Sequence, residues 1–101
     1  MVDIKGFERE YAVTSCGRVW SYKSKRFLKS YPNSDGYYYV KLSKDGISKS
    51  FRVNRLVALA YIPNPEGLPH AGHEDDCKEH NYVSNLYWTT YKENNNHGAH
   101  N

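Results

Sequence analysis

The chain has 101 residues, enough for one domain with a small core, and we expect its ten Tyr, two Trp and three Phe to supply much of that core. No apolar run approaches membrane-spanning length and the N-terminus lacks a basic-then-apolar signal sequence, so the sequence predicts a cytoplasmic protein without a membrane partner. Two cysteines are too few for a disulfide framework.

Charge is distributed unevenly along the chain. Residues 1–60 carry 12 Lys or Arg and 5 Asp or Glu, a net charge of +7, whereas residues 61–101 carry 2 and 6, a net charge of −4. A basic segment suits a phosphate backbone, and an acidic segment suits one only when a divalent cation sits there. This charge distribution favours a protein whose basic segment binds nucleic acid and whose acidic segment holds a metal ion. The alternative is that both segments form ordinary solvated surfaces.

Short strands separated by turns are expected in the first half. Residues 11–13 lead into a Ser-Cys-Gly turn, and residues 18–22 alternate like a strand. Asp35-Gly36 is expected to turn into a strand at 37–42, and Asp45-Gly46 is a preferred tight turn before a strand at 47–53. Basic residues in this half are predicted to contact DNA, with simple solubilisation of exposed strands as the alternative. They are Lys23, Lys25, Arg26, Lys41, Lys49 and Arg52.

A compact helix is predicted directly after the second hairpin. Asn54 is its expected N-cap, and apolar residues at 56, 57, 59 and 60 give it an apolar face. Pro63 and Pro65 end it, and residues 66–73 are expected to be loop.

The segment GHEDDCKEHNYVSNLYW, residues 72–88, is the densest group of polar side chains. We expect a polar turn and then a strand at 82–88, on which Leu86 and Trp88 share one face and anchor the segment to the core. A short helix should follow from residue 89 or 90 to about 97, because Thr90 and Glu93 fit a capping box. The predicted fold class is therefore α+β, with small antiparallel sheets and short helices.

Three segments, in this order, resemble the small HNH endonucleases of phages and mobile introns. They are IKGFEREYAVTSCGRVWS with the strand DGYYYVKL, then VNRLVALAYIPNP, then GHEDDCKEHNYVSNLYWTTYKENNNHG. The resemblance implies a single domain in which residues 1–65 form a β-rich module with a helix, and residues 66–101 form a ββα-metal motif. It also implies a metal-dependent endonuclease acting on double-stranded DNA, and one such site favours nicking of a single strand.

The resemblance implies a role for four residues. His73 matches the general base, and an imidazole that titrates near neutral pH suits that task, although it could be a surface histidine. Asn85 matches the residue that orients the base, with an ordinary turn residue as the alternative. Asn94 matches a ligand of one Mg²⁺ or Mn²⁺ ion, and His97, one turn further on, could face the same cleft. Zn²⁺ is less suited, because Cys77 and His80 provide only half of a zinc site.

Two positions depart from the family pattern. Asn54 stands where relatives commonly have histidine, and Gly72 stands where they usually have an acidic or amide ligand to the metal. His70, Asp75 or Asp76 could compensate for Gly72. Two functions therefore stay open: an active endonuclease, or a catalytically degenerate HNH-like domain that binds DNA or a protein partner. Such a partner could also lend sequence specificity to the active enzyme, and a zinc-stabilised binding module is a third alternative.

Overall fold

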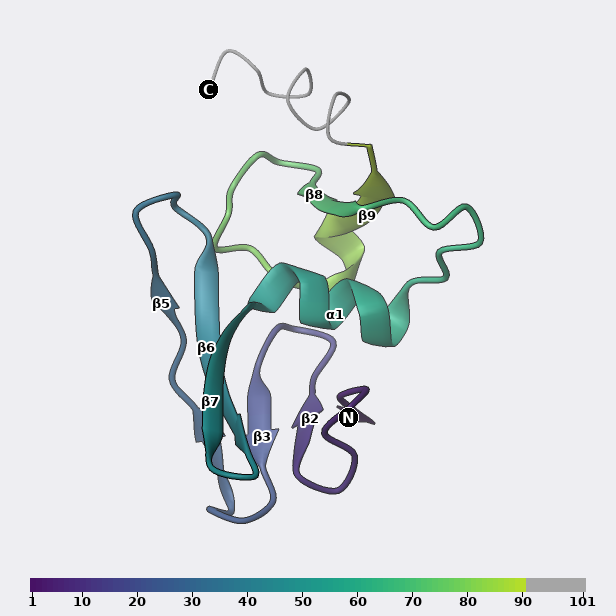
Figure 1. Cartoon of the computed structure of the whole chain (residues 1–101). Coiled ribbons are helices and arrows are strands. Elements are labelled where there is room, and N and C mark those ends of the chain that lie inside the picture. The colour runs from purple at the N-terminus through teal and green to yellow at the C-terminus, as the bar shows by residue number, and fades with distance from the viewer. Residues whose placement is uncertain (91–101) are drawn as a thin grey trace.

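The computed structural model describes residues 1–90, which form three small antiparallel sheets around one α-helix (Figure 1). The first sheet contains four short strands in chain order: Val2–Asp3 (β1), Tyr11–Val13 (β2), Val19–Ser21 (β3) and Arg26–Leu28 (β4). The predicted Ser-Cys-Gly turn joins β2 to β3, where Gly17 has φ +86°. The predicted α+β class is thus confirmed.

The second sheet contains Tyr31–Pro32 (β5), Tyr38–Lys44 (β6) and Ile47–Arg52 (β7). Positive φ angles at Asp45 (53°) and Gly46 (79°) confirm the tight turn between β6 and β7, because a turn of this twist requires them. Successive side chains point to opposite faces of the hairpin. Val40 and Leu42 are buried on one face, and Tyr39, Lys41 and Arg52 lie on the other, which we call the outer face.

Helix α1, Val53–Tyr61, begins two residues earlier than an N-cap at Asn54 would require. Arg52 is the N-cap and makes no capping hydrogen bond. Asn54 is instead buried in the first turn, and its Nδ2 donates to the carbonyl oxygen of Ala71 at 2.8 Å. The capping prediction is wrong because this tertiary contact uses the side chain. The helix ends before Pro63 as expected, with Ile62 extended.

The third sheet pairs His70–His73 (β8) with Leu86–Thr89 (β9), and a 3-10 turn, Val83–Asn85 (η1), precedes β9. Residues 70–73 were expected to be loop, and the strand at 82–88 was expected to start earlier than it does. Both predictions are corrected by the pairing itself, which begins at His73 opposite Leu86 and ends at His70 opposite Thr89. The predicted helix beyond residue 90, with its capping box, lies outside the described residues.

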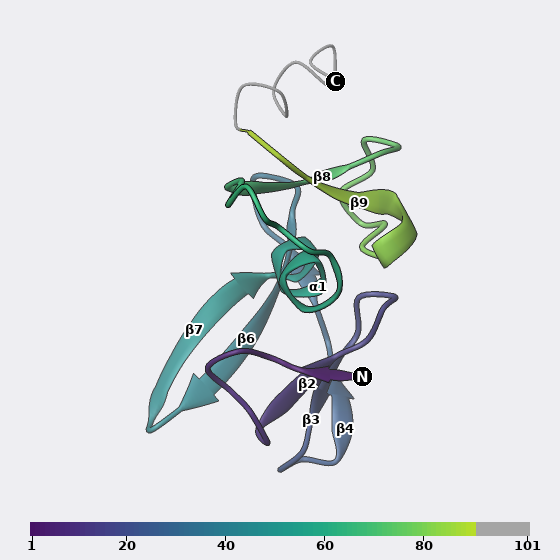
Figure 2. The same cartoon turned by 90° about the vertical axis from the view of Figure 1, so that its right-hand side faces the viewer.

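Helix α1 lies between the β8–β9 hairpin and the four-stranded sheet (Figure 2). The buried cluster that joins these layers is aliphatic: Ile4, Val13, Val19, Val40, Leu42, Val53, Leu56, Val57 and Leu86. Aromatic rings only pack against it from partly buried positions, so the expectation of a largely aromatic core is wrong. Leu86 is confirmed as a core residue, whereas Trp88 is half-buried and donates from Nε1 to the carbonyl oxygen of Ile62 at 3.0 Å. Within residues 1–90, no helix is long and apolar enough to cross a membrane.

Candidate active site

His73 is the last residue of β8 and is only 5% exposed. Its Nε2 lies 2.7 Å from Oδ1 of Asn81, which is itself 6% exposed. An amide oxygen can only accept, so Nε2 carries the proton and Nδ1 keeps its lone pair while the ring is neutral. Asn81 therefore fixes both the orientation and the tautomer of His73, with Nδ1 as the atom that can take up a proton.

Burial lowers the pKa of His73 below 6.5, because charging an imidazole away from water is unfavourable. The hydrogen bond to Asn81 and the negative charge of Asp75 oppose this effect, and the charges of Lys78 and His80 add to it. Because the pKa is lowered, the ring is neutral at pH 7. A neutral imidazole with one protonated and one unprotonated nitrogen is the form that a general base requires.

The turn between β2 and β3 packs against the segment that contains Asn81. A Cβ atom added to Gly17 would lie 2.6 Å from the backbone oxygen of Asn81, so the β2–β3 turn and the segment before η1 are in direct contact. The amide of Val83 donates to the carbonyl oxygen of Ser15 at 2.8 Å across the same contact. A glycine at position 17 is thus required both by its positive φ and by the close approach of Asn81.

Asn85 makes its side-chain hydrogen bonds within the loop between β8 and β9. Its Oδ1 accepts from the amide of Asp75 at 3.2 Å, and its Nδ2 donates to Asp75 Oδ1 and to the carbonyl oxygen of His80, both at 2.9 Å. The side chain that contacts His73 is therefore Asn81, and the orienting role predicted for Asn85 stays a prediction that could act only through the loop. Asn85 instead shapes the loop that carries Asn81. No spacing rule in the sequence distinguishes these two asparagines, because the choice depends on the loop's path.

Asp75 is the centre of the loop between β8 and β9. Its Oδ2 lies 2.6 Å from Nδ1 of His80, and its Oδ1 accepts from the amide of Cys77 at 2.9 Å. The hydrogen bonds from His80, Cys77 and Asn85 lower the pKa of Asp75 far below its usual range, so it is ionised. Both of its oxygens are committed to holding the loop.

A magnesium site is not formed by the described residues alone. Gly72 has no side chain that could bind a metal ion. Asp75, one of the residues suggested to replace it, already uses its carboxylate oxygens in hydrogen bonds with His80 and Asn85. The predicted ligands Asn94 and His97 lie outside the described residues. Three other potential metal ligands do lie close together: the ligand atoms of Cys77, Glu79 and His80 are within 4.8 Å of one another. Glu79, however, accepts from Tyr38 at 3.1 Å, and His80 is bound to Asp75.

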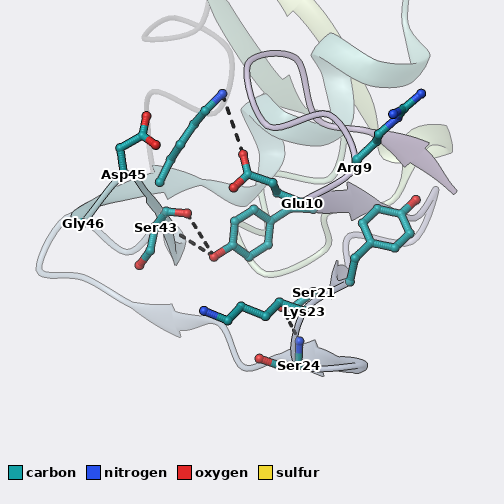
Figure 3. A pocket seen from close by; sticks show the side chains of 11 residues that line it. Arg9, Glu10, Ser21, Lys23, Ser24, Ser43, Asp45 and Gly46 are labelled. Atoms are coloured by element: carbon teal, nitrogen blue, oxygen red, sulfur yellow. Dashed lines mark hydrogen bonds and ion pairs between the residues drawn. The ribbon is translucent and has the colours of Figure 1, made fainter.

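The predicted DNA contacts do not share one surface. Lys41 and Arg52 lie on the outer face of β6–β7, whereas Lys49 pairs with Leu42 and lies on the opposite face. Lys25 and Arg26 lie at the turn into β4. Lys23 lines a groove of about 600 Å³ between β2–β3 and the β6–β7 turn (Figure 3). All residues that line this groove precede residue 47, so it contains no part of the β8–β9 hairpin.

Comparison with known proteins identifies the relatives of this chain. Residues 2–43 match the NUMOD4 motif. The chain is 39% identical over 84 residues to the HNH endonuclease L245 of Acanthamoeba polyphaga mimivirus, a match that covers 83% of this chain and 26% of that protein. It is 41% identical over 92 residues to the DNA endonuclease I-HmuI of Bacillus phage SP01, covering 91% of this chain and 53% of that protein.

The fold of the chain also matches that of an HNH endonuclease. A solved structure of the HNH homing endonuclease I-HmuI, which describes DNA binding and cleavage, matches with a TM-score of 0.87 at 40% identity. The match covers 97% of this chain and 56% of that one, so the chain spans about half the length of I-HmuI. By sequence and by fold together, the chain is homologous over nearly its whole length to part of the HNH endonuclease I-HmuI.

Proposed function

We propose that the chain is the catalytic part of a metal-dependent DNA endonuclease that hydrolyses one phosphodiester bond at a time in double-stranded DNA. The observation that carries this proposal is the His73–Asn81 pair. The His73 imidazole is buried and neutral, and its Nε2 lies 2.7 Å from Oδ1 of Asn81. The I-HmuI relative, a DNA endonuclease, shares 40% of the aligned residues over nearly the whole chain.

His73 acts as the general base in this proposal. Its Nδ1 takes a proton from a water molecule as the water oxygen attacks phosphorus, and the bond from phosphorus to the leaving oxygen breaks. A positioned base of this kind contributes about 10²–10⁴-fold to the rate. Asn81 holds the ring, and the outer face of β6–β7 supplies positive charge for the DNA backbone.

One Mg²⁺ or Mn²⁺ ion completes the proposal. Asn94 and His97 would hold it, and when bound it would neutralise charge on the scissile phosphate. Magnesium commonly keeps several waters and uses substrate phosphate as a ligand, so a site with few protein ligands is chemically reasonable. The proposed place of action is the host-cell cytoplasm, with a separate protein partner or the rest of a longer chain supplying sequence specificity.

The second candidate is a catalytically degenerate HNH-like domain that binds DNA. Gly72 favours it, because a carboxylate is missing beside the proposed base, and the hydrogen bonds of Asp75 prevent a simple replacement. Incubation with supercoiled plasmid separates the two functions. The first predicts conversion to open circles in Mg²⁺ or Mn²⁺ that a chelator stops. The second predicts retarded plasmid on a gel, with no change in topology in either metal.

A further inference from the structure

Tyr37, at the start of the outer face beside β6, lies next to the candidate base. Its ring centroid is 6.1 Å from that of the His73 imidazole. Two cations lie against the same ring: the Arg52 guanidinium at 4.1 Å from the centroid and the Lys78 ammonium at 4.4 Å. Positive charge from two distant parts of the chain is therefore gathered on one aromatic ring beside His73.

Lys78 comes from the acidic half of the chain, where it is one of two lysines after residue 60. It reaches across from the β8–β9 loop, and its Nζ donates to the backbone oxygen of Asp35 at 2.8 Å. A second contact joins Glu79 of this loop to Tyr38, the first residue of β6, and Figure 1 shows the β8–β9 loop beside the start of β6. The position of Lys78 is thus held by its own hydrogen bond to Asp35 and by the contact of the next residue, Glu79, with Tyr38.

The two cations differ in how much of their charge is available. Arg52 is paired with the Asp35 carboxylate at 3.2 Å and also donates to the Tyr39 hydroxyl. Lys78 is exposed, and within residues 1–90 it takes part in no ion pair, because its partner at Asp35 is a neutral carbonyl. A positive charge held in place without a carboxylate partner is what a phosphate group requires.

We propose that Tyr37, Arg52 and Lys78 form a phosphate-binding site for the strand that is cleaved, with Lys78 as the cation that contacts the phosphate. This deepens the proposed function and rests on it. Lys41 lies on the same outer face as Arg52, so the DNA backbone would run from β6–β7 across Tyr37 to His73. Lys78 is a positioning residue in this proposal: it places the backbone relative to Nδ1 of His73.

Salt-dependent binding of a plain DNA duplex by the whole chain tests the site without requiring cleavage. Each phosphate contact adds about 0.9 to the slope of log K against log salt concentration. We expect Lys78→Met to reduce the slope by about that amount, and Lys78→Arg to retain it. Tyr37→Leu should reduce it because the cations lose their support, whereas Tyr37→Phe should not. Lys5→Met, an exposed lysine in the β1–β2 loop, is the matched control and should change it by less than half as much.

Nicking gives the second readout. At saturating DNA, Lys78→Met should slow nicking about 10- to 100-fold through misplacement of the backbone. An unchanged slope for Lys78→Met and Tyr37→Leu, or an equal loss for Lys5→Met, would overturn the phosphate site. If nicking still depends on His73 in that case, the proposed function survives alone. A wild-type chain that neither binds nor nicks DNA would overturn both.

Discussion

Replacing Asn81 tests the structural claim that this residue, and not Asn85, holds His73. In Asn81→Ala the Nε2–H of a histidine that is 5% exposed loses its acceptor. An unsatisfied buried donor costs about 1–3 kcal/mol, so the free energy of unfolding should fall by that amount. The ring is then free to turn and to exchange tautomers, and nicking should fall by about 10- to 100-fold, part of the contribution of a general base.

Asn81→Asp is the informative partner of this variant. A carboxylate keeps the hydrogen bond but places a negative charge beside the imidazole, which favours the protonated ring and raises the pKa of His73. The acid limb of the pH–rate profile should therefore move to higher pH, while the fold tolerates the change. In the wild type, where burial lowers the pKa of His73, this limb should lie below pH 6.5.

Asn85→Ala serves as the comparison, because its partners are Asp75 and His80. It should destabilise the loop, and because it places no charge beside His73, it should move the acid limb less than Asn81→Asp does. The measurements are chemical denaturation and plasmid nicking from pH 5 to 8. A shifted limb in Asn85→Ala, together with an unshifted limb in Asn81→Asp, would refute the assignment.

Three further predictions follow from the same contacts. Gly17→Ala should lower the melting temperature more than Gly6→Ala: both glycines have positive φ, but only at position 17 would the Cβ meet the backbone of Asn81, at 2.6 Å. Equal losses would show that the contact is not tight. Because the folded-state pKa of His73 lies below 6.5, the unfolded chain binds more protons near pH 6, and stability should fall from pH 7.5 to 5.5 by up to about 1.4 kcal/mol per pH unit for each proton. His73→Gln should flatten this dependence, apart from a remainder from His70, whose pKa burial also lowers; an unchanged slope in urea titrations would contradict the burial argument. Gly72→Asp should lower the Mg²⁺ concentration needed for nicking, since a carboxylate is an oxygen ligand that Mg²⁺ prefers and Gly72 lies in a strand without positive φ, so its backbone conformation is open to a side chain; a folded variant with an unchanged metal titration would show that this position does not face the ion.

Local chemistry predicted much of the N-terminal fold. The Asp45-Gly46 turn requires two positive φ angles, and Pro63 excludes a longer helix, so these features are fixed by the residues that form them. Strand β8 was missed because a His-Ala-Gly-His run has little strand propensity of its own. It becomes a strand through pairing with β9 and through the contact between Asn54 and Ala71.

The candidate site was predicted less completely, for a related reason. His73 and its neighbourhood could be found from the order of motifs, but the partner of His73 could not. Asn81 reaches the imidazole because three hydrogen bonds of Asn85 fix the intervening loop. Lys78 lies in an acidic segment and meets Tyr37 only because the loop folds back onto Asp35. Contacts that depend on a loop's path leave no periodic signal in the sequence.

The central claim is that His73 is the base of a DNA endonuclease, and plasmid nicking by His73→Ala tests it most directly. His80→Ala is the control, because it removes an imidazole from the same loop that is more exposed and bound to Asp75. Both variants should be checked for folding and for binding of a plain duplex. The account predicts that His73→Ala binds DNA but nicks it at least about 100-fold more slowly in Mg²⁺ or Mn²⁺, whereas His80→Ala retains much more activity. A folded His73→Ala variant that nicks at nearly the wild-type rate would contradict it.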